Sequence, residues 1–355
     1  MRPWMRLFVA SLAAMALCGA GLAAQARAQD AFRASRLLGR GINLGNALEA
    51  PQEGAWSITL EPGYFQTIKE AGFDSVRIPI RWSVHADNRP PYRIDPDFFR
   101  RVDWAIDEAQ SHGLVAVIDM HHYTELVDQP ARQLHRLEAL WRQIAAHYRD
   151  RPESLYFEVL NEPHGRLSDA RWDRMVPSLI RAIRATNPRR MLIVGPGYWN
   201  NPGHLRNLHL PRKDRRLIVT FHYYSPMPFT HQGADWVRGS EHWRGTTWEG
   251  TARQRRRVAS DFHAAASWAK AHRRPLFLGE FGAYQEADMA SRARWTRAVV
   301  QEAEKRGFSW SYWEFASGFG AYDPKAHAWR HPILDALMSA GRLASRQQPP
   351  ACAVP

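Results

Sequence analysis

Two glutamates stand in short, distinctive contexts that suit a reaction needing a pair of carboxyl groups. Glu162 lies within Asn161–Pro163, and Glu280 lies within Gly279–Gly282. Two carboxyl groups on either side of a bound sugar can cleave a glycosidic bond, because one donates a proton to the leaving oxygen while the other, ionised, attacks the anomeric carbon. Mutual repulsion raises one pKa and keeps that acid protonated near neutral pH. A lone glutamate would more often be a surface charge or a partner in a buried ion pair.

The distance between the two carboxyl groups decides the stereochemical outcome of such a reaction. A separation of about 5–5.5 Å gives retention, and about 6.5–9.5 Å gives inversion, because a water molecule must then fit between sugar and base. From the residues alone, both outcomes stay open.

Both glutamates end short β-rich runs that alternate with helical patterns. The β-rich runs are Gly41–Asn46, Ser75–Trp82, Val115–His122, Tyr156–Glu162, Arg190–Pro196, Leu217–Tyr224, Pro275–Phe281 and Phe308–Phe315. The helical patterns between them include Pro62–Ala71, Pro96–His112, Leu134–Tyr148, Ala170–Thr186, Arg253–His272 and Ala290–Arg306. Strands that alternate with helices imply a parallel sheet. Eight such units predict a single α/β domain, a closed (β/α)8 (TIM) barrel.

In such a barrel the active site lies at the carboxyl ends of the strands. The predicted strand ends carry polar, aromatic and ionisable residues, and strands four and seven face each other across the mouth. Glu162 and Glu280 are therefore expected to flank one cleft. Alternation along the strands places Arg77, Asp119 and Glu158 on the inward face below them, where unpaired charges would be costly. Asp119 and Glu158 are expected to belong to a buried hydrogen-bonded network that supports the site and does no chemistry itself.

Several of these segments, in this order, resemble glycoside hydrolase family 5, the cellulase A family of clan A. The matching motifs are Arg77-Ile78-Pro79, Asp119–His122, Asn161–Pro163, His222–Tyr224 and Gly279–Gly282, and the likeness runs from Gly41–Asn46 to Trp310–Phe315. Phe229–Trp236 and Ser317–Gly320 further resemble a subgroup of bacterial endoglucanases, some of which also cut mannan. The resemblance implies the same barrel and nearly covers the chain after its first 40 residues.

The resemblance also implies roles. Glu162 would be the general acid/base and Glu280 the nucleophile that forms a glycosyl-enzyme intermediate. Asn161 would bind the sugar 2-hydroxyl, and Tyr224 would hold the nucleophile. The other implied residues are Arg77 near the nucleophile, His222 beside the acid/base, His121 and His122 at sugar hydroxyls, Trp313 as a stacking floor, and Asn46, Glu49, His231 and Trp236 at more distant sugars. Trp313 could instead belong to the core, Trp82 and Trp199 stay undecided, and Glu314 should point away from the site.

The expected function is that of a retaining endo-β-1,4-glucanase, a cellulase acting on plant polysaccharide by double displacement. A β-mannanase or a mixed-linkage glucanase with the same mechanism is the alternative, and a non-catalytic polysaccharide-binding barrel is a third hypothesis. No cofactor is expected. His121, His122 and His222 suggest zinc, but the first strand ends in Leu44-Gly45-Asn46 without the His-x-His of metal-dependent barrel hydrolases, so no metal is expected either.

The chain is strongly basic, with a formal net charge of +13 and a pI of about 10.2. Such a charge attracts polyanions. The basic residues are spread along the chain, however, and no finger, RNP or helix-turn-helix signature is present. A nucleic-acid partner is not expected, and the 15 tryptophans suit a large core or stacking on sugars.

The first 28 residues resemble a signal peptide. Arg2 and Arg6 precede an apolar stretch over 7–24, and Ala-x-Ala sites follow at 24–26 and 26–28. A membrane anchor and a lipoprotein modified at Cys18 are the alternatives. We expect a catalytic barrel over 30–345, a disordered tail over 346–355, and a monomer that is secreted or periplasmic without stable membrane association. With Cys18 removed, Cys352 would be the one remaining cysteine.

Overall fold

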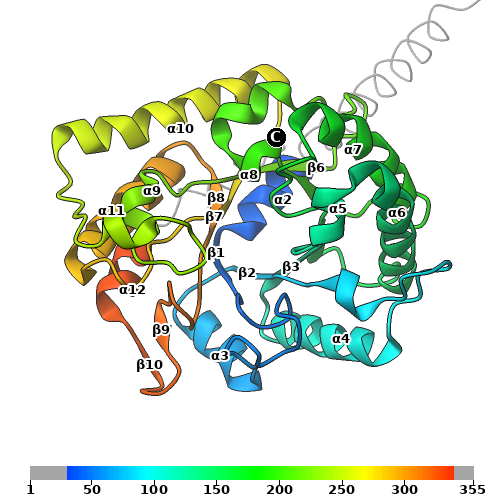
Figure 1. Ribbon diagram of the computed structural model, residues 1–355, viewed down its shortest axis with the longest axis horizontal. Helices are drawn as coiled ribbons and strands as arrows, with labels where there is room; N and C mark the ends of the chain where they lie inside the picture. Colours follow the sequence, from blue (N-terminus) through cyan, green and yellow to red (C-terminus); the bar gives the residue numbers. More distant parts are fainter. Residues whose placement is uncertain (1–29, 340–355) are drawn as a thin grey trace, which may run out of the picture.

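The computed structural model describes residues 30–339, so the predicted signal peptide, the predicted tail and both cysteines lie outside the described residues. Eight parallel strands pair in chain order and close into a barrel, because β1 pairs with both β2 and β8 (Figure 1). The strands are β1 Arg40–Asn43, β2 Ser75–Ile78, β3 Val115–Asp119, β4 Leu155–Glu158, β5 Leu192–Val194, β6 Leu217–His222, β7 Leu276–Glu280 and β8 Ser309–Tyr312. The predicted (β/α)8 barrel is confirmed.

Long helices surround the strands and agree with the predicted helical patterns to within about four residues. They are α3 Pro62–Glu70, α4 Pro96–Ser111, α6 Pro130–His147, α7 Asp169–Arg184, α10 Ala252–His272 and α11 Met289–Lys305. Proline occupies the first turn of α3, α4 and α6, where its missing N–H costs no hydrogen bond. Side chains of Asp95, Thr251 and Asp288 cap α4, α10 and α11.

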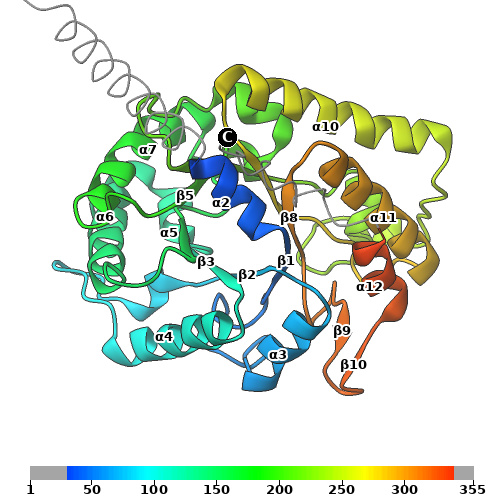
Figure 2. The ribbon, with the colours of Figure 1, turned by 180° about the vertical axis from the view of Figure 1, so that it is seen from behind.

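Two further helices close the fold, and the sequence patterns did not predict either of them. Helix α12 (His331–Met338) follows β8 and a small hairpin of β9 (Tyr322–Asp323) and β10 (Ala328–Trp329). Helix α2 (Asp30–Leu38) lies across the amino-terminal end of the barrel, as Figure 2 shows from behind. Between β5 and β6 the chain forms only the short turns α8 (Gly197–Asn200) and η2 (Pro202–Asn207).

Apolar side chains fill two separate layers. The larger lies between the strands and the outer helices. The smaller lies inside the amino-terminal end of the barrel, beneath α2, and consists of Ala31, Ala34, Leu38, Val115, Val117, Tyr156, Met191, Ile193, Ile218 and Phe277. We call this second layer the basal plug. It leaves the opposite end of the barrel interior to polar residues.

The strands stop earlier than the β-rich runs predicted. Strand β4 ends at Glu158 and β8 ends at Tyr312, so Glu162 and Trp313 both lie in the loops that follow their strands. Glu162 has a φ of 45°, a left-handed conformation that costs a non-glycine residue about 1–3 kcal/mol. This turn aims the side chain back over the barrel mouth.

Candidate active site

The two predicted carboxylates meet at the carboxyl end of the barrel. Glu280 is the last residue of β7 and is buried, whereas the Glu162 side chain is 24% exposed. One oxygen of each carboxylate and one ring nitrogen of His222 lie within 4.8 Å of one another. The structure therefore brings Glu162 and Glu280 together at one site, as expected, at a spacing closer to that of retaining than of inverting enzymes.

Glycines on either side of Glu280 allow the neighbouring strands to approach it. A Cβ at Gly279 would lie 2.5 Å from Thr220 Oγ1, and one at Gly282 would overlap the backbone carbonyl of Trp313. The Gly-Glu-Phe-Gly motif is thus explained by close packing of β6, β7 and the loop after β8 around Glu280.

Glu280 is held by two hydrogen-bond donors. Arg77 Nη1 donates to its Oε1 at 2.8 Å, and the Tyr224 hydroxyl donates to its Oε2 at 3.0 Å. Burial raises the pKa of Glu280 to about 7, and this rise is opposed by His222, Arg77 and the Tyr224 hydroxyl. A cation and a hydroxyl donor on one carboxylate favour its ionised form.

Glu162 has weaker support for its charge. Burial raises its pKa to about 7, and its carboxylate is hydrogen-bonded to the side chain of His222, whose Nδ1 lies 2.8 Å from Oε1. The two carboxyl groups titrate as a coupled pair. Because Glu280 has Arg77 and Tyr224, the shared negative charge resides on Glu280 and the proton on Glu162.

His222 is neutral, because burial lowers its pKa. Asn200 Nδ2 lies 3.3 Å from His222 Nε2 and donates to it, so the ring proton is on Nδ1 and points at Glu162. Asn200 was not among the predicted residues. It ends the left-handed turn of α8, in which Tyr198, Trp199 and Asn200 all have positive φ. No sequence signal indicated that this turn would reach His222.

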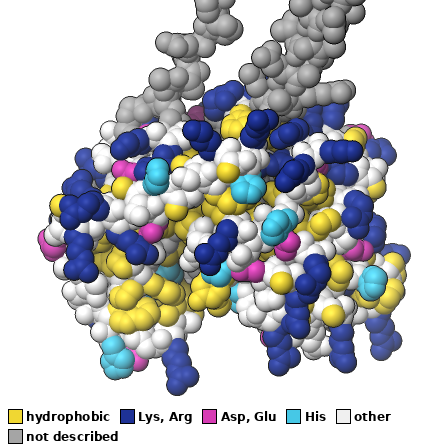
Figure 3. Space-filling model, turned by 90° about the horizontal axis from the view of Figure 1, so that it is seen from above, with side chains coloured by type: hydrophobic (Ala, Val, Ile, Leu, Met, Phe, Trp, Pro, Cys, Tyr) yellow, Lys and Arg dark blue, Asp and Glu magenta, His cyan; other side chains and the backbone are white. Residues whose placement is uncertain are grey.

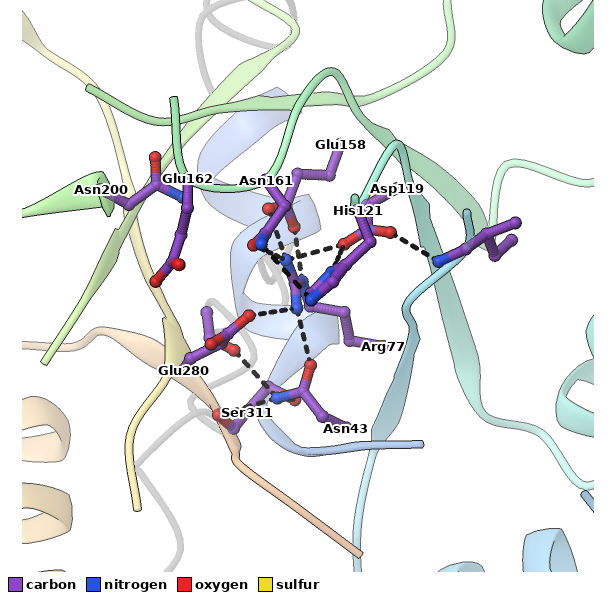
Figure 4. Close-up of polar contacts among 12 residues, drawn as sticks. Asn43, Arg77, Asp119, His121, Glu158, Asn161, Glu162, Asn200, Glu280 and Ser311 are labelled. Carbon is purple, nitrogen blue, oxygen red and sulfur yellow. Dashed lines mark hydrogen bonds and ion pairs between the residues drawn. The ribbon is translucent and has the colours of Figure 1, made fainter. Parts of the chain in front are cut away.

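Below the carboxylates, Arg77 joins three strands in a buried network, shown in Figure 4. Its guanidinium is paired with Glu158 at 2.7 Å, Asp119 at 2.8 Å and Glu280 at 2.8 Å. It also donates to Asn43 and Asn161, at 2.9 and 2.8 Å. The predicted supporting network is confirmed, and Asn43 is an addition to it.

The more peripheral predicted residues take part in two separate groups of ring contacts. Trp313 is half-buried and stacks parallel to His121 at 5.5 Å, and His122 meets the exposed Trp56 edge-on at 5.7 Å. His231 packs against Tyr224 at 4.9 Å, and burial lowers its pKa to about 4. Trp236 is 56% exposed. Contact of these residues with sugars stays a prediction.

Two of the predicted residues, Glu49 and Asn46, lie in the loop after β1. Glu49 is 1% exposed, and both of its oxygens accept backbone N–H groups, from Asn46 and from Ala47. The prediction that Glu49 contacts a distant sugar is therefore corrected: its carboxylate shapes the loop after β1. Asn46, at a φ of 65°, stays half-buried beside it.

The two tryptophans without a predicted role, Trp82 and Trp199, differ in burial. Trp82 is fully buried and donates its indole N–H to the Asp119 carbonyl, whereas Trp199 is 45% exposed and stacks on His164. Glu314 points away from the site as expected, because its carboxylate accepts N–H groups from Ala316, Ser317 and Phe319.

Glu162, His222 and Glu280 are also close enough together to hold a metal ion, and within residues 30–339 they are the one such acid–histidine group. The Arg77 guanidinium lies 2.8 Å from Glu280, however. A second cation there would be repelled at short range. The donor set therefore fits a proton-transferring pair better than a metal site.

Comparisons with known proteins agree with this geometry. The family model described as Cellulase (glycosyl hydrolase family 5) matches residues 44–318. Endoglucanase H of Acetivibrio thermocellus is 38% identical over 321 residues, which is 89% of this chain and 34% of that protein. This chain thus spans about a third of the length of that relative.

This chain covers nearly the whole length of several solved structures to which it is similar. An endoglucanase is 44% identical with a TM-score of 0.86, covering 87% of this chain and 100% of that one. Thermotoga maritima Cel5A, solved with cellobiose and with mannotriose, is 47% identical with a TM-score of 0.86 over the same shares. The cellulose synthase subunit Z of Clostridioides difficile is 41% identical with a TM-score of 0.82, covering 85% and 99%.

Proposed function

The chain belongs to glycosyl hydrolase family 5, and from that premise we propose that it is a retaining endo-β-1,4-glucanase acting on plant polysaccharide. The observation that carries the proposal is the carboxylate pair: oxygens of Glu162 and Glu280 within 4.8 Å, with a cation and a hydroxyl donor on Glu280 alone. That spacing suits retention and is short for inversion.

The first chemical step uses the two carboxyl groups in different states. Glu280 attacks the anomeric carbon while Glu162 transfers its proton to the departing glycosidic oxygen, which leaves as the hydroxyl of the released sugar chain. The product is a glycosyl ester of Glu280. Because the His222 Nδ1–H points at Oε1 of Glu162, the proton to be transferred sits on Oε2.

The second step reverses the roles. Glu162, now ionised, takes a proton from a water molecule, and the resulting hydroxide attacks the anomeric carbon and releases Glu280 as a carboxylate. The neutral His222 donor stabilises ionised Glu162 between the steps. Two inversions at one carbon restore the original anomeric configuration.

Glucan is the proposed substrate, with β-mannan or mixed-linkage glucan as the alternative for the same mechanism. The name endoglucanase recurs among the relatives, and the Cel5A structures hold cellobiose in one case and mannotriose in another. Initial rates of reducing-sugar release from carboxymethylcellulose, barley β-glucan and glucomannan, measured in parallel, decide between them. A faster rate on glucomannan than on both glucans would overturn the glucanase assignment.

The roles of the two glutamates are tested by substitution and rescue. Glu280→Ala should lose turnover by at least about 10⁴-fold, and added azide should restore cleavage of an activated aryl β-cellobioside and give the α-glycosyl azide. Glu162→Ala should give the β-glycosyl azide, because azide there attacks the glycosyl-enzyme. A matched control is Glu304→Gln, a buried carboxylate at the other end of the barrel that pairs with Arg40 at 2.8 Å. The same azide anomer from both variants would overturn the assignment.

We also propose export and a monomeric state. Within residues 30–339 no helix is long and apolar enough to cross a membrane. Lys and Arg side chains are scattered over the face shown in Figure 3 and do not form one stripe, which supports a carbohydrate partner over a nucleic acid. N-terminal sequencing of protein from the exporting cell tests cleavage near residue 28, and light scattering tests the oligomeric state.

A further inference from the structure

Asn161, the residue expected at the sugar 2-hydroxyl, has its amide group held from two sides. Arg77 Nη2 donates to Asn161 Oδ1 at 2.8 Å, and Asn161 Nδ2 lies 3.3 Å from His121 Nε2. An amide NH₂ has two hydrogens, so one N–H serves His121 and the other stays available to a ligand. Asn161 is 8% exposed, and the available N–H is the part of it that a sugar can use.

The contact with His121 requires one particular tautomer. Asn161 Nδ2 can donate to His121 Nε2 only if that nitrogen carries no hydrogen. With the hydrogen on Nε2 instead, the amide would have to turn over, and its NH₂ group would then face the donor Arg77. The site therefore works only with the His121 hydrogen on Nδ1.

Asp119 supplies the group that selects this tautomer. Its Oδ2 lies 2.7 Å from His121 Nδ1 and forms an ion pair with Arg77 Nη2 at 2.8 Å, and its Oδ1 accepts from the Ile80 backbone N–H at 2.9 Å. Burial raises the pKa of Asp119 to about 6, and Arg77 and the Ile80 N–H oppose this rise, so near neutral pH the carboxylate is ionised and can only accept. Burial lowers the pKa of His121 well below its usual range, so the ring has a single hydrogen to place.

We propose that Asp119 is a positioning residue for recognition of the sugar C2 hydroxyl, acting through the His121 tautomer on the Asn161 amide. Both nitrogens of His121 are used within the protein, so His121 also acts on the sugar through Asn161. This inference rests on the proposed function, because the C2 hydroxyl is the group by which a retaining glycosidase gains transition-state hydrogen bonding and by which glucosides differ from mannosides.

Glu158 provides a matched control in the same network. It is equally buried and contacts the same guanidinium, with Arg77 Nε and Nη2 at 2.7 and 2.8 Å, but no contact joins it to His121 in the described structure. A general loosening of Arg77 would follow from either carboxylate. A change in C2 recognition should follow from Asp119 alone.

The test compares Asp119→Ala, Asp119→Asn and Glu158→Gln on two activated substrates, an aryl β-cellobioside and its analogue lacking the C2 hydroxyl on the ring that bears the leaving group. Asp119→Ala should lower kcat/KM about 10–100-fold on the parent substrate but much less on the 2-deoxy analogue, because the lost hydrogen bond is absent there. Asp119→Asn keeps an acceptor oxygen for His121 and Arg77 but turns its NH₂ toward the Ile80 N–H, so it should regain part of the loss on the parent substrate. Glu158→Gln should affect both substrates by the same factor.

Nitrogen-15 NMR of the His121 imidazole gives a readout that needs neither turnover nor a substrate. The wild type and Asp119→Asn should show Nδ1 protonated, and Asp119→Ala should show a mixture or the other tautomer, with the signal assigned by its loss in His121→Phe. If Asp119→Ala does not fold, His121→Phe replaces it in the kinetic comparison and should show the same C2-dependent loss.

The outcomes are separable. Equal losses on the two substrates, or an unchanged tautomer in Asp119→Ala, would overturn the role of Asp119 while leaving the glycosidase intact. A wild type that cleaves neither substrate would overturn the proposed function, and the NMR result would still decide whether Asp119 sets the tautomer.

Discussion

The two ends of the barrel interior are filled with opposite kinds of side chain. At the carboxyl end, the Arg77 guanidinium is buried among three carboxylates, from Asp119, Glu158 and Glu280. At the amino end, the basal plug is apolar, and a buried hydroxyl pair, Ser35 with Ser309 at 3.0 Å, joins α2 to the start of β8.

The two ends of the barrel therefore have different roles: the carboxyl end holds the charged groups of the site, and the amino end stabilises the fold. Buried charges cost desolvation energy and are weak contributors to stability, whereas apolar burial contributes about 25 cal/mol per Å². The basal plug thus offsets the electrostatic cost of the catalytic end. Substitutions at the two ends should accordingly differ in whether they change turnover or the free energy of unfolding.

The largest effect is expected where one residue serves both tasks. Arg77→Met would leave three carboxylates facing one another without a cation, so the free energy of unfolding should fall by about 3–5 kcal/mol and kcat by about 10³-fold or more. Urea unfolding and kcat on carboxymethylcellulose measure both quantities. The control is Arg190→Met, because Arg190 donates to backbone carbonyls such as those of Tyr148 and Leu155 near the start of β4. If Arg190→Met lowered kcat as much as Arg77→Met, the two ends would not be functionally distinct.

A second comparison uses two residues of one strand, β7. Phe277→Ala removes a fully buried ring from the basal plug and should cost about 3–5 kcal/mol of stability with kcat of the folded enzyme unchanged. Glu280→Gln should abolish turnover and leave the unfolding midpoint equal to the wild type or higher, since it removes a buried charge. A stability loss in Glu280→Gln larger than that in Phe277→Ala would contradict the division of tasks.

The third prediction deletes one hydroxyl at each end. Tyr224→Phe removes the donor to Glu280 and should lower kcat about 10–100-fold with little change in stability. Tyr156→Phe removes the donor to the Ala34 carbonyl, at 3.2 Å beneath α2, and should cost about 1 kcal/mol of stability with no change in kcat. Differential scanning calorimetry measures stability, and kcat is measured in parallel. The prediction is wrong if both variants lower mainly kcat or both lower mainly stability.

The smallest expected effect is a pH dependence confined to the catalytic end. Because the pKa of Glu162 is raised to about 7, its proton, and with it kcat/KM, should be lost as pH rises through about 7. The same raised pKa means that the folded state binds this proton more tightly than the unfolded chain. Its contribution to stability is complete below about pH 4.5 and is lost as pH rises through about 7. Glu162→Gln should flatten the fall of Tm between those values; an unchanged slope would assign the fall to other buried carboxyls.

Much of the barrel followed from local pattern. Alternating β-rich and helical runs predicted eight strands and six of the outer helices, because periodicity is a property of neighbouring residues. Helix α2 was missed, since its buried partners Phe277 and Val117 lie far away in the chain. The strand ends were predicted too long, because the turn that places Glu162 at a φ of 45° has no sequence signature of its own.

The sequence by itself predicted which residues would carry the chemistry: the glutamate pair, its arginine and the aromatic and histidine residues around it stand in recognisable motifs at or just after strand ends. Only the tertiary structure decided how they work. The spacing of the two carboxyl groups and the hydrogen bond from Asn200 to His222 join residues on different strands or loops. The hydrogen bonds from Ala47 to Glu49 and from His121 to Asp119 join residues only two apart, but they depend on the shape that the folded loops take. Charge states and tautomers are set by such contacts, and contacts across a barrel depend on closure of the whole sheet rather than on any one segment.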